Sequence, residues 1–76
     1  MSISINYTDK QINKLVSKLD NQQVKNILTE FYIYSGNTQD SISNLFNNSD
    51  NLKYDLENHI KSENIDMITV LLEINN

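Results

Sequence analysis

The stretch NIDMITVLLEIN, residues 64–75, decides the fold, because it is the most apolar run in the chain and fits two secondary structures. Its Ile, Thr and Val residues favour a strand. At about 100° per residue of a helix, however, Ser62, Asp66, Thr69 and Glu73 share one sector of about 60°. Every apolar residue of the run lies outside that sector. A strand would mix polar and apolar side chains on one face, so the sequence predicts a helix.

This helix is expected to have a wide apolar surface, covering more than half of its circumference. A helix with such a surface is usually buried on several sides. We therefore expect the last segment to lie at the centre of a bundle or to be covered by a partner.

Two capping boxes predict helices in the first half of the chain. Gln11 follows Thr8 by three residues, and Gln23 follows Asp20 in the same way, so each pair can bond side chain to backbone reciprocally. Apolar residues then recur at helical spacing over about 8–19 and from 20 onwards. Gly36 can adopt the left-handed conformation that ends the second helix.

Two shorter helices are expected before the last one. The first begins at residue 37 or 38, has an acidic residue in its first turn, and ends at the asparagines 47–48. Ser49 or Asp50 is the expected cap of the next helix, and Asn64 that of the last.

The resulting fold class is all-α, a compact bundle of four to five short helices in a single domain, residues 1–76, with residues 1–7 as an extended N-terminal arm. One alternative remains. The alternating residues 2–6, the aromatic run in 30–35 and the apolar run in 66–74 could instead form a small sheet in an α+β fold.

The segment HIKSENIDMITVLLEIN, residues 59–75, resembles the second part of an ankyrin repeat, in which a short helix, a turn and a longer Ile/Leu-rich helix follow one another. The T-P-L-H signature and the 33-residue period are absent. The resemblance implies helix–turn–helix geometry at this end of the chain and carries no function with it.

Composition limits what holds this chain together. It has 76 residues and no cysteine, so disulfides and thiolate metal sites are excluded. A domain of this size buries only a modest core. The stability that disulfides provide in other small domains must here come from good local helix signals, from self-association or from a partner.

Charge is unevenly distributed along the chain. The net charge is -4, and residues 39–76 contain two Lys against seven Asp or Glu. An acidic half repels nucleic acid and anionic lipid, and suits a basic protein surface. The start of the sequence has no signal-peptide pattern and no apolar run is long enough to span a membrane, so we expect a cytoplasmic protein.

The sequence predicts no catalytic residues, no metal and no cofactor. His59 has Asp55 and Glu63 four residues before and after it, which places three polar side chains on one helical face. A metal site needs three or four convergent ligands, which one face of one helix rarely provides. Neither a nucleophile motif nor a glycine-rich phosphate loop is present.

Residues 39–60 also resemble a DNA-binding helix-turn-helix, which leaves a DNA-binding regulator as one functional alternative. The would-be recognition helix carries Asp50, Asp55 and Glu57 against Lys53, and acidic residues oppose phosphate binding. If DNA were bound, we would expect a dimer using the lysine row 10, 14 and 18.

Protein binding is the function that the sequence favours. On helical projections, Ile33 and Tyr54 lie away from the apolar stripes, and Tyr32 lies at the edge of one. Exposed aromatic and aliphatic residues are common interface anchors. Together with three acidic residues they form the expected protein-binding set: Tyr32, Ile33, Tyr54, Asp50, Asp55 and Glu57.

These observations favour a small acidic protein-binding module that occludes a basic surface on another protein. An inhibitor or immunity-type protein from a phage or other mobile element fits this description. A homo-oligomeric structural component, such as a homodimer that shares its C-terminal helix, is the second alternative.

Overall fold

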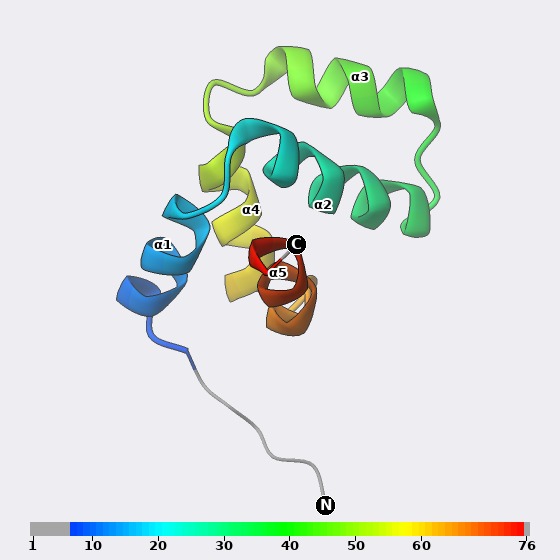
Figure 1. Ribbon diagram of the computed structural model, residues 1–76. Helices are drawn as coiled ribbons and strands as arrows, with labels where there is room; N and C mark the ends of the chain where they lie inside the picture. Colours follow the sequence, from blue (N-terminus) through cyan, green and yellow to red (C-terminus); the bar gives the residue numbers. More distant parts are fainter. Residues whose placement is uncertain (1–6, 76) are drawn as a thin grey trace, which may run out of the picture.

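The computed structural model describes residues 7–75 (Figure 1). Every helix in this range begins at a polar side chain that accepts a backbone hydrogen bond. The helices and their caps are α1 (Asp9–Ser17, cap Thr8), α2 (Asn21–Tyr34, cap Asp20), α3 (Gln39–Asn48, cap Thr38), α4 (Leu52–Lys61, cap Asn51) and α5 (Met67–Ile74, cap Asp66). Both predicted capping boxes are confirmed, at Thr8 with Gln11 and at Asp20 with Gln23.

The end of α2 is fixed by Gly36, as the sequence predicts. The N–H of Asn37 donates to the carbonyl of Tyr32 at 2.9 Å, and that of Gly36 donates to the carbonyl of Ile33 at 3.0 Å. This pair of bonds is the Schellman motif. It requires a left-handed residue, and Gly36 has a φ of 94°.

The end of α4 uses the same motif without a glycine. The N–H groups of Asn64 and Glu63 donate to the carbonyls of His59 and Ile60, both at 2.9 Å. Glu63 occupies the left-handed position, with a φ of 61°. A side chain with a Cβ is strained there by about 1 kcal/mol.

The core lies between α1, α2, α4 and α5, which pack against one another around it (Figure 1). Its buried side chains are all aliphatic or Met. They are Ile12, Val16, Leu19, Val24, Ile27, Leu28, Leu56, Ile60, Ile65, Met67 and Val70. Leu19 and Val24 flank the start of α2 and are both buried there, as expected for a hydrophobic staple.

Helix α3 lies outside this core, along α2 (Figure 1). Ile42 is its one buried side chain, and Phe46 packs against the core from the edge. Leu45, which the sequence assigns to the same apolar face, is 42% exposed. Because α3 is covered by few neighbours, part of its apolar stripe faces solvent.

The predicted all-α bundle is confirmed, and no strand occurs in residues 7–75. Residues 66–74 and 30–35, which would form strands in the α+β alternative, lie almost wholly in α5 and α2. The expected N-terminal arm falls outside the described residues, except for Tyr7, which packs against the core. The two helices and the turn that the ankyrin resemblance implies are present in α4 and α5, but α5, with 8 residues, is shorter than α4, with 10, and not longer as in that repeat.

Three predicted boundaries are wrong. Asn51 caps α4 in place of Ser49 or Asp50, and the Ser49 hydroxyl donates to the Asp55 carboxylate instead. Asp66 caps α5 in place of Asn64, because Ile65 is drawn into the core from the connection. Helix α1 ends before residue 19, since the turn that follows it buries Leu19.

We expected α5 to lie at the centre of the bundle or to be covered by a partner, and the structure shows that it is not central. Cover by a partner stays a prediction. Met67 and Val70 are buried against the rest of the bundle. Ile68 and Leu72, which follow one another by one turn, are 62% and 66% exposed. Helix α5 therefore covers the core with one side only and leaves a second apolar strip open.

The longest helix in the described part of the chain is α2, with 14 residues. No helix between residues 7 and 75 has the length and apolar character that crossing a membrane requires.

Candidate protein-binding surface

The structure divides the six predicted binding residues into exposed and packed groups. Ile33 and Tyr54 are 51% and 58% exposed, so their predicted exposure is confirmed. Asp50 is exposed, and Asp55 and Tyr32 are half-buried. Glu57 is 8% exposed and is the one buried charged residue among those described.

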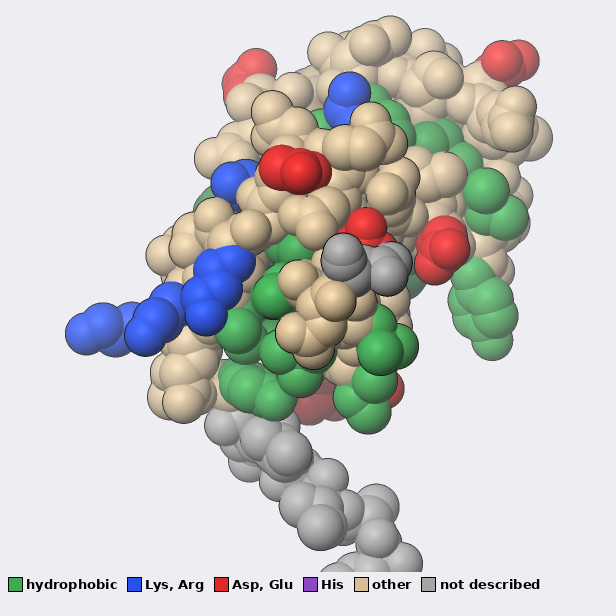
Figure 2. Space-filling view, in the orientation of Figure 1, with side chains coloured by type: hydrophobic (Ala, Val, Ile, Leu, Met, Phe, Trp, Pro, Cys, Tyr) green, Lys and Arg blue, Asp and Glu red, His purple; other side chains and the backbone are tan. Residues whose placement is uncertain are grey.

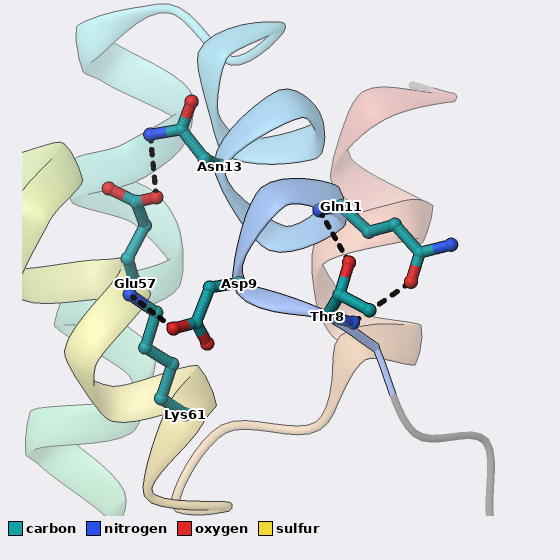
Figure 3. A network of polar contacts seen from close by, with 6 residues as sticks. All are labelled: Thr8, Asp9, Gln11, Asn13, Glu57 and Lys61. Atoms are coloured by element: carbon teal, nitrogen blue, oxygen red, sulfur yellow. Dashed lines mark hydrogen bonds and ion pairs between the residues drawn. The ribbon is translucent and has the colours of Figure 1, made fainter.

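Glu57 belongs to the interface between α1 and α4. Its carboxylate accepts a hydrogen bond from the Asn13 amide at 2.9 Å, which links the two helices (Figure 3). One turn further along α4, Lys61 lies 4.0 Å from the Asp9 carboxylate. Assigning Glu57 to an exposed acidic surface is therefore a mistake, because this residue lies on the α1 side of α4.

Tyr32 is a packing residue that joins three helices. Its ring lies 6.2 Å from that of Phe46 and 5.7 Å from that of His59, and its hydroxyl is 3.4 Å from His59 Nε2. Burial, and secondly the negative charge of Asp55, raises the pKa of Tyr32 above its ordinary value. Tyr32 thus holds α2, α3 and α4 together and presents only part of its surface to solvent.

Three of the predicted residues meet in a hollow where α3 ends and α4 begins. This α3–α4 hollow has a volume of about 400 Å³. Its lining residues are Leu45, Asn48, Ser49, Asp50, Asn51, Tyr54 and Asp55. An exposed aromatic ring and an exposed Leu therefore lie beside two carboxylates, although these residues come from two helices and a loop.

The loop between α3 and α4 sets the shape of this hollow. Asn51 accepts from the Tyr54 N–H at 3.2 Å and so fixes the first turn of α4. The Ser49 hydroxyl donates to Asp55, which holds the loop against that turn. Tyr54 and Asp50 are left free to contact solvent, whereas Asp55 has one oxygen engaged.

Ile33 lies outside this hollow, near the end of α2. Tyr34, the next residue, is 93% exposed. Sequence reasoning missed Tyr34, Leu45, Ile68 and Leu72 as exposed apolar residues. Helical projection could not have found them, because Tyr34 falls beside Ile27 at the edge of the α2 stripe and the other three lie on faces that look suited to a core.

The three side chains considered for a metal do not converge. His59 is half-buried and packs against Phe31, with ring centres 4.7 Å apart and ring planes tilted by 49°. Within residues 7–75 no three His, Cys, Asp or Glu side chains are grouped closely enough to hold a metal ion.

Comparisons with protein-family models, curated proteins and solved structures give no match to this chain.

Proposed function

We propose that this protein is a protein-binding module whose α3–α4 hollow receives a basic side chain of another protein. The observation that carries the proposal is the grouping of exposed Tyr54 and Leu45 with Asp50 and Asp55 in one hollow. The apolar residues offer contact area, and the carboxylates favour a Lys or Arg over other anchors.

The chemistry of the hollow supports this choice of partner. An Arg or Lys can pack its aliphatic stem on Tyr54 and Leu45 while its charge approaches Asp50. Aromatic rings also attract cations at their faces. The one hydrogen bond that Asp55 accepts, from Ser49, leaves its remaining oxygen lone pairs available to such a guest.

The charge of the chain supports the same proposal at longer range. The seven Asp and Glu side chains within residues 39–76 would attract a basic surface before contact. Such attraction raises the association rate more than the final affinity. The inhibitor or immunity-type role, the origin in a mobile element and the cytoplasmic location remain predictions from the sequence.

A selection experiment tests the proposal with peptides in place of the natural partner. The full chain is used to select binders from a random displayed-peptide library at about physiological salt. We expect the selected peptides to be enriched in Lys or Arg next to apolar residues. Tyr54→Ala should weaken their binding about tenfold, as loss of a central anchor does.

Tyr34→Ala is the matched control, because Tyr34 is more exposed than Tyr54 but lies on α2, away from the hollow. It should leave the affinity unchanged. Asp50→Asn should lower the affinity and its dependence on salt. Peptides without basic residues, or peptides that bind Tyr54→Ala as tightly as the parent chain, would contradict the proposal.

A further inference from the structure

The C-terminal end of α3 differs from the ends of α2 and α4 in how its carbonyl groups are bonded. The last carbonyls of an α-helix have no partner in a following turn of the helix. At the ends of α2 and α4, two N–H groups fold back and donate to them at 2.9 to 3.0 Å. After α3 the chain leaves in an extended conformation, with a ψ of 127° at Ser49. Within residues 7–75, the backbone bond that closes this end runs from the Ser49 N–H to the Phe46 carbonyl and is long, at 3.4 Å. The end of α3 therefore keeps carbonyl oxygens that can accept further hydrogen bonds.

This end of α3 borders the α3–α4 hollow. Leu45 and Asn48, from the last turn of α3, line the hollow, and so do the next two residues, Ser49 and Asp50. The carbonyls of an α-helix point toward its C-terminal end and give that end a partial negative charge of about half a unit. A guest in the hollow thus meets two kinds of acceptor, the carboxylates and the carbonyls at the end of α3.

The cations of the protein leave these acceptors open. Lys53, the nearest Lys in sequence, is not among the residues that line the hollow. In Figure 2, a row of Lys side chains projects at the lower left, over α1 and away from α3 at the top. As far as residues 7–75 form it, the lining of the hollow holds two carboxylates and no Lys.

One feature of the hollow opposes a cation, because α4 begins there and the N–H groups of a first helical turn favour anions. Asn51 covers one of these groups by accepting from the Tyr54 N–H at 3.2 Å. The carboxylate of Asp55 lies in the same turn and offsets the rest of this positive charge. The hollow therefore still favours a positively charged guest.

Arginine suits this set of groups better than lysine. The guanidinium is a rigid planar fork of N–H donors, so it can donate to a carboxylate and to backbone carbonyls at the same time. Its flat face also stacks on aromatic rings, whereas the lysine ammonium is a compact and strongly hydrated charge. Tyr54 supplies such a ring at the hollow and is 58% exposed.

We propose that the α3–α4 hollow selects arginine over lysine in the partner protein. The guanidinium of the partner's arginine stacks on Tyr54 and donates to Asp50 and to the carbonyls at the end of α3. This inference rests on the proposed function, in which the hollow receives a basic side chain. Asp50 supplies the charge that attracts the guest, while Tyr54 and the end of α3 distinguish one basic side chain from the other.

Peptide variants test the selectivity. The tightest peptides from the library selection are synthesised with each basic residue as Arg, as Lys or as citrulline, which keeps the planar shape of Arg without its charge. Isothermal titration with the full chain gives the dissociation constants. We expect the Lys form of the anchor to bind about tenfold more weakly than the Arg form, as loss of a bidentate, stacked contact does. The citrulline form should also bind more weakly, because it loses the attraction of Asp50.

The outcomes separate this inference from the proposed function. Arg and Lys forms of equal affinity would overturn the selectivity and leave a hollow for basic side chains intact. Citrulline and Arg forms of equal affinity, or selected peptides that contain no basic residue, would overturn both.

Variants of the protein test the role of the aromatic ring. Tyr54→Leu keeps an apolar side chain but removes the flat face, so the ratio between the Lys and Arg dissociation constants should fall from about ten to near one. Tyr54→Phe restores a ring and should restore the ratio. Tyr34→Leu is the control, because Tyr34 is exposed but lies outside the hollow, and it should leave the ratio as in the parent chain. A ratio that survives Tyr54→Leu would exclude stacking as its cause.

Carbonyl chemical shifts test the part played by the end of α3. In the ¹³C-labelled protein, the carbonyl signals of residues 45–48 should move when the Arg peptide binds and move less with the Lys peptide. The carbonyls of Tyr32 and Ile33 are the control, since those at the end of α2 already accept bonds at 2.9 and 3.0 Å. If the signals of residues 45–48 stay in place with a bound Arg peptide, the carbonyls take no part in recognition and the proposal is wrong.

Discussion

At the scale of single residues, two positions of the same motif differ in how well the side chain fits the backbone. Gly36 and Glu63 both occupy the left-handed position that ends a helix. A Cβ built at Gly36 meets no atom within 4 Å, so the glycine is required by its φ and not by space. Glu63 has a Cβ, which disfavours the left-handed conformation, so the backbone at this residue is strained.

Replacing Glu63 with Gly should therefore stabilise the protein. Glycine removes the strain of the left-handed conformation, which outweighs its greater freedom in the unfolded chain, and the expected gain is about 1 kcal/mol. Urea denaturation followed by circular dichroism measures it. Ser62→Gly is the control, because Ser62 has a φ of -81° and should lose stability on replacement. Equal effects at both positions would rule out strain at residue 63.

Tyr32 gives the protein a specific sensitivity to alkaline pH. Its raised pKa means that the folded state keeps a proton that the unfolded state releases. The proton on Tyr32 therefore stabilises the folded state. This stabilisation is present in full at a pH below the ordinary pKa of 10.0, and it is lost as the pH rises through the higher pKa of the folded state.

The expected result is that the free energy of unfolding falls between about pH 9 and pH 11, and that Tyr32→Phe reduces this fall. Urea titrations at several pH values measure it. Tyr34→Phe, at a residue that is 93% exposed, should behave like the parent chain. If Tyr32→Phe and Tyr34→Phe show the same pH dependence, burial of Tyr32 is not its cause.

At the scale of helices, α3 differs from the others in how much it buries. It contributes one buried side chain, Ile42, whereas α2 and α4 each contribute three. Its contact with the core is mainly through Phe46, which packs against Tyr32. Elements with few buried contacts open locally at a lower free energy than the whole protein.

We therefore expect the backbone amides of α3 to exchange with solvent faster than those of α2 and α4. Hydrogen exchange followed by NMR, on well-hydrogen-bonded amides in the middle of each helix, measures the difference. Phe46→Ala should increase exchange in α3 much more than in α1, which lies away from it. Uniform protection of all the helices would show that α3 unfolds only with the rest of the molecule.

At the scale of the whole molecule, small size explains why apolar surface is left over. A domain of 76 residues has a stability of about 4–11 kcal/mol and buries a smaller share of its surface than larger domains do. Four helices enclose one core, so α3 and the outer side of α5 have nothing within the described chain to cover them. The α3–α4 hollow proposed for binding is lined in part by one of these uncovered elements, α3.

The sequence alone was sufficient to predict the helices. Capping boxes, the terminating glycine and the polar sector of α5 act over three to seven residues, so they work independently of the rest of the fold. The boundaries that were wrong, at Asn51 and Asp66, lie where several polar residues could serve as caps and packing selected one.

Tertiary structure decided which side of each helix is covered, and this determined the candidate surfaces. Glu57 has the sequence pattern of a surface acid, but α1 packs over it and Asn13 bonds to it. Ile68 and Leu72 have the pattern of core residues, yet they remain exposed. Burial depends on neighbours that are distant in sequence, whereas helix formation depends on neighbours along the chain. The local pattern therefore predicted the elements, and only their packing showed which residues are free to bind.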